Sequence, residues 1–185
     1  MFNKFFISFF VFINFFSTLH TNEKELIINR LNNINNITFD FEQITNKKKE
    51  VGTCVLFFDD KLSCDYKDSV QKRILINRKT LVVHQKRYDK IYFYPIKNSP
   101  LIKIFNKKKL INLIKKSDYH LNGDINLTYV GKDKHKVIIF FNKDNYDLVG
   151  WRVIDQLQNV INFTIKITHE NSEINPKIFK IPSIN

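Results

Sequence analysis

Residue types that carry out catalysis are sparse in this sequence and form no known catalytic motif. The five histidines, at positions 20, 84, 120, 135 and 169, are widely spaced, and none belongs to an H-E-x-x-H motif or a short ligand pair. Only four glycines occur, with no G-x-x-x-x-G-K phosphate loop and no G-x-S-x-G nucleophile elbow. We therefore expect a protein that is not an enzyme and that uses no metal ion and no cofactor.

Two cysteines have a spacing that predicts a covalent link. Cys54 and Cys64 lie at equal distances in sequence from Asp59, and the pair Asp59-Asp60 is typical of a hairpin turn. A hairpin with an odd-length loop centred on Asp59 places the cysteines directly opposite, within disulfide reach. We expect a structural disulfide in an oxidising compartment, and the alternative is two buried free thiols. A redox catalyst is not expected, because there is no C-x-x-C motif.

The N-terminus indicates export. Met1–Lys4 is a short positive segment, Phe5–Phe16 is almost wholly apolar, and the chain turns polar from Thr18. An apolar run of about 12 residues is shorter than the roughly 20 that a membrane span needs, and it is typical of a secretory signal peptide. We predict a signal peptide at residues 1–22 and one mature domain at 23–185. An uncleaved anchor or a buried helix is the alternative.

Composition favours one folded domain with a basic surface. Of the 185 residues, 43% are apolar and 14% aromatic, which excludes a disordered chain. Lys and Arg outnumber Asp and Glu by 30 to 18, a net charge of +12. Nucleic acid is not an expected partner, because the lysines lie in turns and beside one amphipathic segment, and because export separates the protein from nucleic acid.

The remaining pattern predicts one antiparallel sheet with helical interruptions. Apolar and polar residues alternate in short segments separated by turn-like groups, which is typical of strands with one buried face. Helical spacing predicts a helix at 23–33, and a basic amphipathic helix or two short ones at 98–116, beginning with Ser99-Pro100. The second segment lies either on a membrane surface or over the sheet, and we favour the sheet. The predicted strands are 37–42, 51–58, 62–66, 72–77, 80–85, 90–94, 125–130, 136–142, 146–154 and 160–168.

The order of these segments resembles a known family, the periplasmic outer-membrane lipoprotein carrier proteins (LolA). The resemblance covers about residues 23–182, and the order of the motifs is more specific than any one of them. The motifs are Ile37–Gln43, Gly52, Leu62–Tyr66, Asn77–Leu81, Tyr92–Pro95, Ser99–Leu101, Gly150–Asp155 and Asn175–Phe179.

The resemblance implies a mainly β fold, an open half-barrel of about 10–11 antiparallel strands with a helical lid. It also implies a soluble monomeric carrier in the periplasm of a Gram-negative bacterium. Such a carrier takes lipoproteins from an inner-membrane ABC transporter and delivers them to an outer-membrane receptor. Two positions depart from the family: Phe57–Asp60 lacks the arginine that is thought to hold the lid, and Cys64 replaces a tryptophan. A non-carrier envelope module for sensing or scaffolding, with a similar half-barrel, is the alternative.

The resemblance places the lipid site in a hydrophobic cavity between sheet and lid. Burial of an acyl chain there is worth about 0.8 kcal/mol per methylene group. The alternative is that the same residues simply pack against one another. The expected lining residues are Ile37, Phe39, Phe41, Leu56, Leu62, Leu101, Ile104, Phe105, Phe163 and Ile165.

Overall fold

A computed structural model describes residues 17–96, 102–131 and 134–182 of the chain, with side chains from residue 22 onward. Leu101, the pair Ser99-Pro100 and most of the predicted signal peptide lie outside these residues. The strands are β1 (Asn36–Thr45), β2 (Lys48–Phe57), β3 (Lys61–Tyr66), β4 (Lys72–Asn77), β5 (Thr80–Gln85), β6 (Lys90–Pro95), β7 (Asp118–Asn122), β8 (Asp124–Val130), β9 (Lys136–Phe141), β10 (Leu148–Ile154) and β11 (Val160–Glu170). The helices are α1 (Ser17–Asn32), α2 (Ile102–Phe105) and α3 (Lys107–Lys116), and the 3-10 turns are η1 (Lys86–Tyr88) and η2 (Pro176–Phe179).

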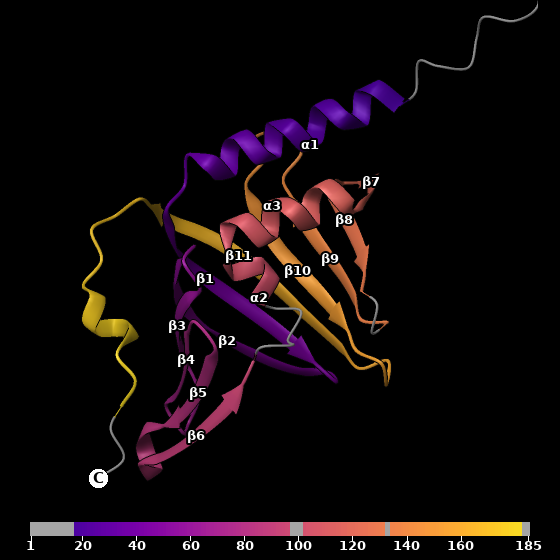
Figure 1. Cartoon of the computed structure of the whole chain (residues 1–185). Helices are drawn as coiled ribbons and strands as arrows, with labels where there is room; N and C mark the ends of the chain where they lie inside the picture. The colour runs from indigo at the N-terminus through magenta and orange to yellow at the C-terminus, as the bar shows by residue number, and fades with distance from the viewer. Residues whose placement is uncertain (1–16, 97–101, 132–133, 183–185) are drawn as a thin grey trace, which may run out of the picture.

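The strands form one 11-stranded antiparallel sheet with the order β6-β5-β4-β3-β2-β1-β11-β10-β9-β8-β7. The first and last strands pair at its centre, so two meanders meet along β1 and β11. The sheet curves while its edge strands β6 and β7 remain unpaired with each other, which makes an open half-barrel (Figure 1). The predicted fold class is confirmed.

Three elements differ from what the sequence predicts. Strand β7 was not predicted, because an edge strand with few buried positions shows little alternation. Strand β2 begins at Lys48, earlier than predicted, because Asn46 and Lys47 form a two-residue turn in which both have positive φ (49° and 70°). The amphipathic segment is two helices, since the backbone of Asn106 is extended between them (φ −113°, ψ 120°).

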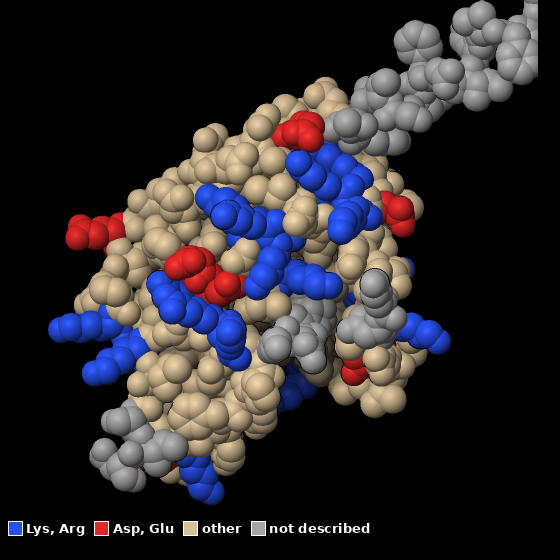
Figure 2. All heavy atoms as spheres, in the orientation of Figure 1, with Lys and Arg blue, Asp and Glu red and all other residues tan. Residues whose placement is uncertain are grey.

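Helices α1, α2 and α3 lie over one face of the sheet, which we call the concave face, and together we call them the helical cover (Figure 1). The apolar stripe of α3 is Leu110, Leu113 and Ile114, and all three side chains are buried in the main core. The basic segment therefore covers the sheet, as favoured, and four of its lysines are exposed: Lys108, Lys109, Lys115 and Lys116. Figure 2 shows basic side chains on this face of the molecule. Among the described residues, no helix has both the length and the hydropathy that crossing a membrane requires.

Candidate functional site

Rows of apolar side chains cross the strands on the concave face. Residues directly opposite each other in an antiparallel pair point to the same side of the sheet. One row, from β1 to β6, is Ile37, Leu56, Leu62, Ile76, Leu81 and Tyr94. The next row along the strands is Phe39, Cys54, Cys64, Ile74, Val83 and Tyr92. Both rows start in the main core, so both face the helical cover.

These rows leave the core as they approach the β6 edge. On β1 to β3 their members are buried, and Leu81 on β5 is half-buried. At β6, Tyr92 and Tyr94 are 40% and 48% exposed. The apolar floor of the half-barrel thus runs without interruption from the packed core to accessible side chains.

Nine of the ten expected lining residues lie together in one core cluster on the concave side. They are Ile37, Phe39, Phe41, Leu56, Leu62, Ile104, Phe105, Phe163 and Ile165. Each is buried among other protein atoms in this structure. The accessible apolar residues of the same floor are others, which sequence analysis missed: Ile74, Leu81, Val83, Tyr92 and Tyr94. In the sequence, Tyr92 and Tyr94 stand out only as part of a Tyr-Phe-Tyr motif. The alternation of a strand does not show which of its side chains are exposed.

A ladder of aromatic rings joins the helical cover to both halves of the sheet. Phe105 of α2 meets Trp151 of β10 edge-on, with ring centroids 5.8 Å apart. Trp151 stacks on Phe163 at 4.5 Å, and Phe163 stacks on Phe41 at 4.8 Å. Phe41 in turn meets Tyr66 of β3 edge-on at 4.8 Å. Each such pair contributes about 0.5–1.5 kcal/mol beyond its burial, so the ladder stiffens the floor.

The ladder ends on a half-buried polar cluster. The hydroxyl of Tyr66 donates to Oε1 of Gln43 at 2.7 Å, and the Lys72 ammonium lies 3.8 Å from the Tyr66 ring centroid. Burial raises the pKa of the Tyr66 hydroxyl well above its usual range, and the charge of Glu50 adds to this. Burial opposes ionisation of Glu50, but hydrogen bonds from Lys72 and Lys48 outweigh it and hold the pKa of that carboxyl below its ordinary value. A charged pair therefore borders the apolar floor.

A disulfide between Cys54 and Cys64 joins β2 and β3 within this floor. The two residues are direct partners across the strands, with Cα atoms 4.1 Å apart, and both are buried. The pairing predicted from hairpin symmetry is confirmed. The bond ties together the two strands whose turn contacts the helical cover.

The β2–β3 turn holds the helical cover through its backbone. The N–H of Asp60 donates to the carbonyl of Phe105 at the end of α2, at 3.3 Å. The N–H of Lys107 at the start of α3 donates to the carbonyl of Phe58, also at 3.3 Å. The turn thus meets the junction between α2 and α3.

Side chains complete this contact, which we call the latch (Asp60 with Asn106). Nδ2 of Asn106 donates to Oδ2 of Asp60 at 2.9 Å. Nζ of Lys109 lies 3.8 Å from Oδ1 of the same carboxylate. Oδ1 of Asn106 also accepts from the N–H of Lys109 at 3.0 Å and so caps α3. The stretch Phe57–Asp60, which has no arginine, therefore contacts the cover through an acidic side chain instead.

A second anchor ties α1 to the residue before β10 and to the last residue of β11. Nε of Arg30 donates to Oδ1 of Asp147 at 2.8 Å, and the same guanidinium also bonds the carboxylate of Glu170. Nζ of Lys24 donates to the carbonyl of Ser117, which follows α3, at 2.6 Å. The cover is thus fixed to the strands at α1, whereas α2 and α3 are held by the latch, by the two backbone hydrogen bonds to the β2–β3 turn and by their apolar faces.

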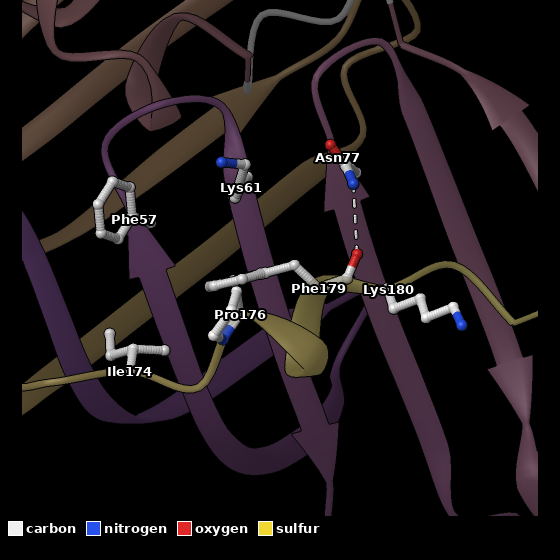
Figure 3. A pocket seen from close by; sticks show the side chains of 7 residues that line it. All are labelled: Phe57, Lys61, Asn77, Ile174, Pro176, Phe179 and Lys180. Atoms are coloured by element: carbon white, nitrogen blue, oxygen red, sulfur yellow. Dashed lines mark hydrogen bonds between the residues drawn. The ribbon is translucent and has the colours of Figure 1, made fainter.

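A separate cleft lies on the opposite, convex face (Figure 3). The C-terminal segment packs there against β3 and β4, and Nδ2 of Asn77 donates to the carbonyl of Phe179 at 3.3 Å. The cleft has a volume of about 260 Å³ and is lined by Phe57, Lys61, Asn77, Ile174, Pro176, Phe179 and Lys180. Phe179 is buried but is not part of the main core, so this segment covers a small apolar area of its own. In the part of the chain that the structure describes, no three His, Cys, Asp or Glu side chains group as metal ligands.

An open antiparallel half-barrel with helices over an apolar face is the architecture expected of lipoprotein-carrier-like proteins. The family model for the outer membrane lipoprotein carrier protein LolA matches residues 32–182. The chain therefore belongs to the LolA family, whose members are carriers or binding proteins. A comparison with curated proteins gives no match.

Solved structures share the fold at low sequence identity. An uncharacterized conserved protein from Thermus thermophilus has a TM-score of 0.51 at 9% identity, over 85% of this chain and 93% of that chain. The lipoprotein LppX of Mycobacterium tuberculosis has a TM-score of 0.51 at 12% identity, over 86% of this chain and 98% of that chain. MucB has a TM-score of 0.51 at 10% identity, over 88% of this chain and 64% of that chain. Similarity at these identities shows the fold alone.

Proposed function

We propose that this protein binds the acyl chains of a lipoprotein on its concave face and carries the lipoprotein across the periplasm, from an inner-membrane ABC transporter to an outer-membrane receptor. One observation carries the proposal. In a chain of the LolA family, the apolar floor runs from under the helical cover to accessible side chains at β5 and β6.

The accessible end of the floor provides the binding energy. An acyl chain that lies along Ile74 and Leu81 toward Tyr92 and Tyr94 removes apolar surface from water, at about 0.8 kcal/mol per methylene group. Deeper entry requires α2 to move away from the floor. The latch, two backbone hydrogen bonds to the β2–β3 turn and apolar packing hold α2 and α3, and none of these contacts belongs to the pairing of the strands. The two helices can therefore shift while the hydrogen bonds between strands stay intact.

Export is part of the same proposal. The predicted signal peptide at 1–22 would deliver the chain to the periplasm, and a disulfide at Cys54–Cys64 is suited to that oxidising compartment. Transfer itself needs no bond to be broken. A ligand moves onward when its affinity differs between the closed and opened forms of the carrier.

A second function is supported by the packing of the core. The expected lining residues bury one another, and the aromatic ladder fills the centre of the floor. This packing suits a module that senses or scaffolds envelope proteins through the same half-barrel and takes up no acyl chain. The two functions predict different partners, a lipopeptide for the carrier and a protein alone for the module.

The test uses the mature chain (residues 23–185) and a synthetic triacylated lipopeptide, with native mass spectrometry and a fluorescence titration. A one-to-one complex is expected. The double variant Tyr92→Glu with Tyr94→Glu places charges on the floor and should weaken binding at least tenfold, because each carboxylate would have to be desolvated.

Phe93→Glu is the matched control. Phe93 lies between the two tyrosines and is 42% exposed, but it pairs with Val82 and points to the convex side. It should leave lipopeptide binding unchanged. If the unmodified chain binds no lipopeptide yet captures a lipid-free envelope protein, the carrier function is refuted and the sensing or scaffolding module is supported. Equal loss in the control would refute the assignment of the floor.

A further inference from the structure

We propose that the outer side of α3 is an electrostatic docking surface for an anionic lipid bilayer. The surface is a stripe of four lysines, Lys108, Lys109, Lys115 and Lys116, which we call the lysine stripe. It lies on the opposite side of α3 from the residues that pack on the sheet, so it is separate from the proposed acyl-chain site. The inference stands whether or not the protein carries lipoproteins.

The spacing of exposed residues defines the stripe. The exposed positions of α3 are 108, 109, 112, 115 and 116, which recur at i, i+1, i+4, i+7 and i+8 and so share one side of the helix. Lysine fills every one of them except Asn112. Neither α2 nor α3 contains an acidic residue. Figure 2 shows basic side chains gathered over the helical cover on this face of the molecule.

The stripe is not explained by the stability of the helix. Lys115 and Lys116 lie in the last turn of α3, where positive charge is favourable, but Lys107–Lys109 occupy the first turn, where it opposes the helix dipole. An acidic residue would stabilise that turn, and none is present. Lysine at both ends therefore extends the charged surface along the helix at a cost to its first turn. Nζ of Lys109 is 3.8 Å from Asp60, and its side chain remains 50% exposed.

The chemistry of the stripe favours a bilayer over a protein. Lysine is depleted in protein interfaces, whose strongest contacts come from Trp, Tyr and Arg buried in pockets. The exposed positions of α3 carry none of these anchor residues. A flat row of flexible ammonium groups instead gains attraction from diffuse negative charge without a fixed geometry. Because Leu110, Leu113 and Ile114 are buried against the sheet, we expect adsorption at the headgroups without insertion of the helix.

Vesicle co-sedimentation of the mature chain tests this inference. The chain should bind vesicles of phosphatidylcholine mixed with phosphatidylglycerol, should not bind phosphatidylcholine alone, and should be released by salt. The variant Lys108→Gln, Lys109→Gln, Lys115→Gln and Lys116→Gln should bind several hundredfold more weakly, since each lysine contributes about fivefold. A control variant removes the same charge from four exposed lysines elsewhere, Lys47→Gln, Lys67→Gln, Lys166→Gln and Lys177→Gln.

Each possible result of this assay supports or refutes the docking surface. If the stripe variant loses vesicle binding and the control variant retains it, the docking surface is supported. Equal loss of vesicle binding in both variants would show that the bilayer attracts the net charge of the protein, which would overturn the inference. It would also be overturned if the unmodified chain bound no vesicles, or bound only an acidic protein. Circular dichroism verifies folding of both variants. Lipopeptide binding should persist in the stripe variant, which separates this result from the fate of the proposed carrier function.

Discussion

Replacing Asn106 with alanine should weaken the hold of the β2–β3 turn on α2 and α3 while leaving the sheet folded, because only the backbone hydrogen bonds and the Lys109–Asp60 contact would remain there. The amide caps α3 at the N–H of Lys109 and donates to the carboxylate of Asp60 at 2.9 Å. Loss of such a cap costs about 1 kcal/mol. Loss of a hydrogen bond to a charged group costs about 1.5–3 kcal/mol, with the lower end applying here because Asn106 is partly exposed. The expected local loss is about 2–3 kcal/mol.

Amide hydrogen exchange measures this loss directly. A decrease of that size speeds exchange in α2 and α3 by roughly 30-fold to 150-fold, whereas amides at the centre of the sheet in β1 and β11 should change little. Asn112→Ala is the control, because Asn112 lies on the exposed side of the same helix and alanine is a better helix former. Acceleration in this control would indicate that the helix responds to any substitution.

A double-mutant cycle shows whether the latch itself is the cause. Asp60→Gly removes the carboxylate, and glycine readily adopts the left-handed backbone of that position (φ 60°). The two substitutions together should cost less than the sum of the two alone, by about 1 kcal/mol, because they remove the same contact. Strict additivity, unchanged exchange in α3, or equal acceleration across the whole sheet would refute the idea that this contact holds the cover.

Three further outcomes are expected. Gly52→Ala should lower the melting temperature by several degrees, corresponding to about 1–3 kcal/mol, because the new methyl group would clash with the backbone carbonyl of Asp65; an unchanged melting temperature would contradict the close approach of β2 and β3. Removing the disulfide with Cys54→Ala and Cys64→Ala should lower the free energy of unfolding, measured in urea, by about 2–3 kcal/mol. Equal urea midpoints for this variant and the unmodified chain would argue against a structural role of the disulfide. Because lysine contacts outweigh burial and keep the folded pKa of Glu50 below its ordinary value, this carboxylate stabilises the fold above that value and loses its contribution as the pH falls through the folded pKa. Glu50→Gln should therefore flatten the decline of the melting temperature as the pH falls below the ordinary range of a glutamate pKa, and an identical decline in the variant and the unmodified chain would refute the assignment.

Strand positions and the disulfide were accessible from sequence because both depend on local order. Alternation at Ile37, Phe39 and Phe41 reflects a backbone that points successive side chains to opposite faces. The cysteine pairing followed from the symmetry of one hairpin, and the register of β2 and β3 confirms it. Strand β7 escaped because an edge strand buries few side chains and so shows little pattern.

The latch could not be predicted in the same way. Asp60 and Asn106 are 46 residues apart, and each has an ordinary local role, one in a turn and one at a helix N-cap. Their contact depends on where α2 and α3 lie over the sheet. Long-range hydrogen bonds of this kind leave no periodic signal in the sequence.

The sequence by itself determined that this chain forms an antiparallel sheet with a basic amphipathic segment and a covalent hairpin, since periodicity and turn chemistry act over a few residues. Only the tertiary structure decided which apolar side chains remain accessible. Phe163 and Tyr94 both belong to alternating strands, yet one is buried in the aromatic ladder beneath the cover and the other is 48% exposed. The reason is physical: exposure depends on whether a strand lies at the centre or the edge of the sheet and on where the helices cross it, and both are set by contacts between distant segments.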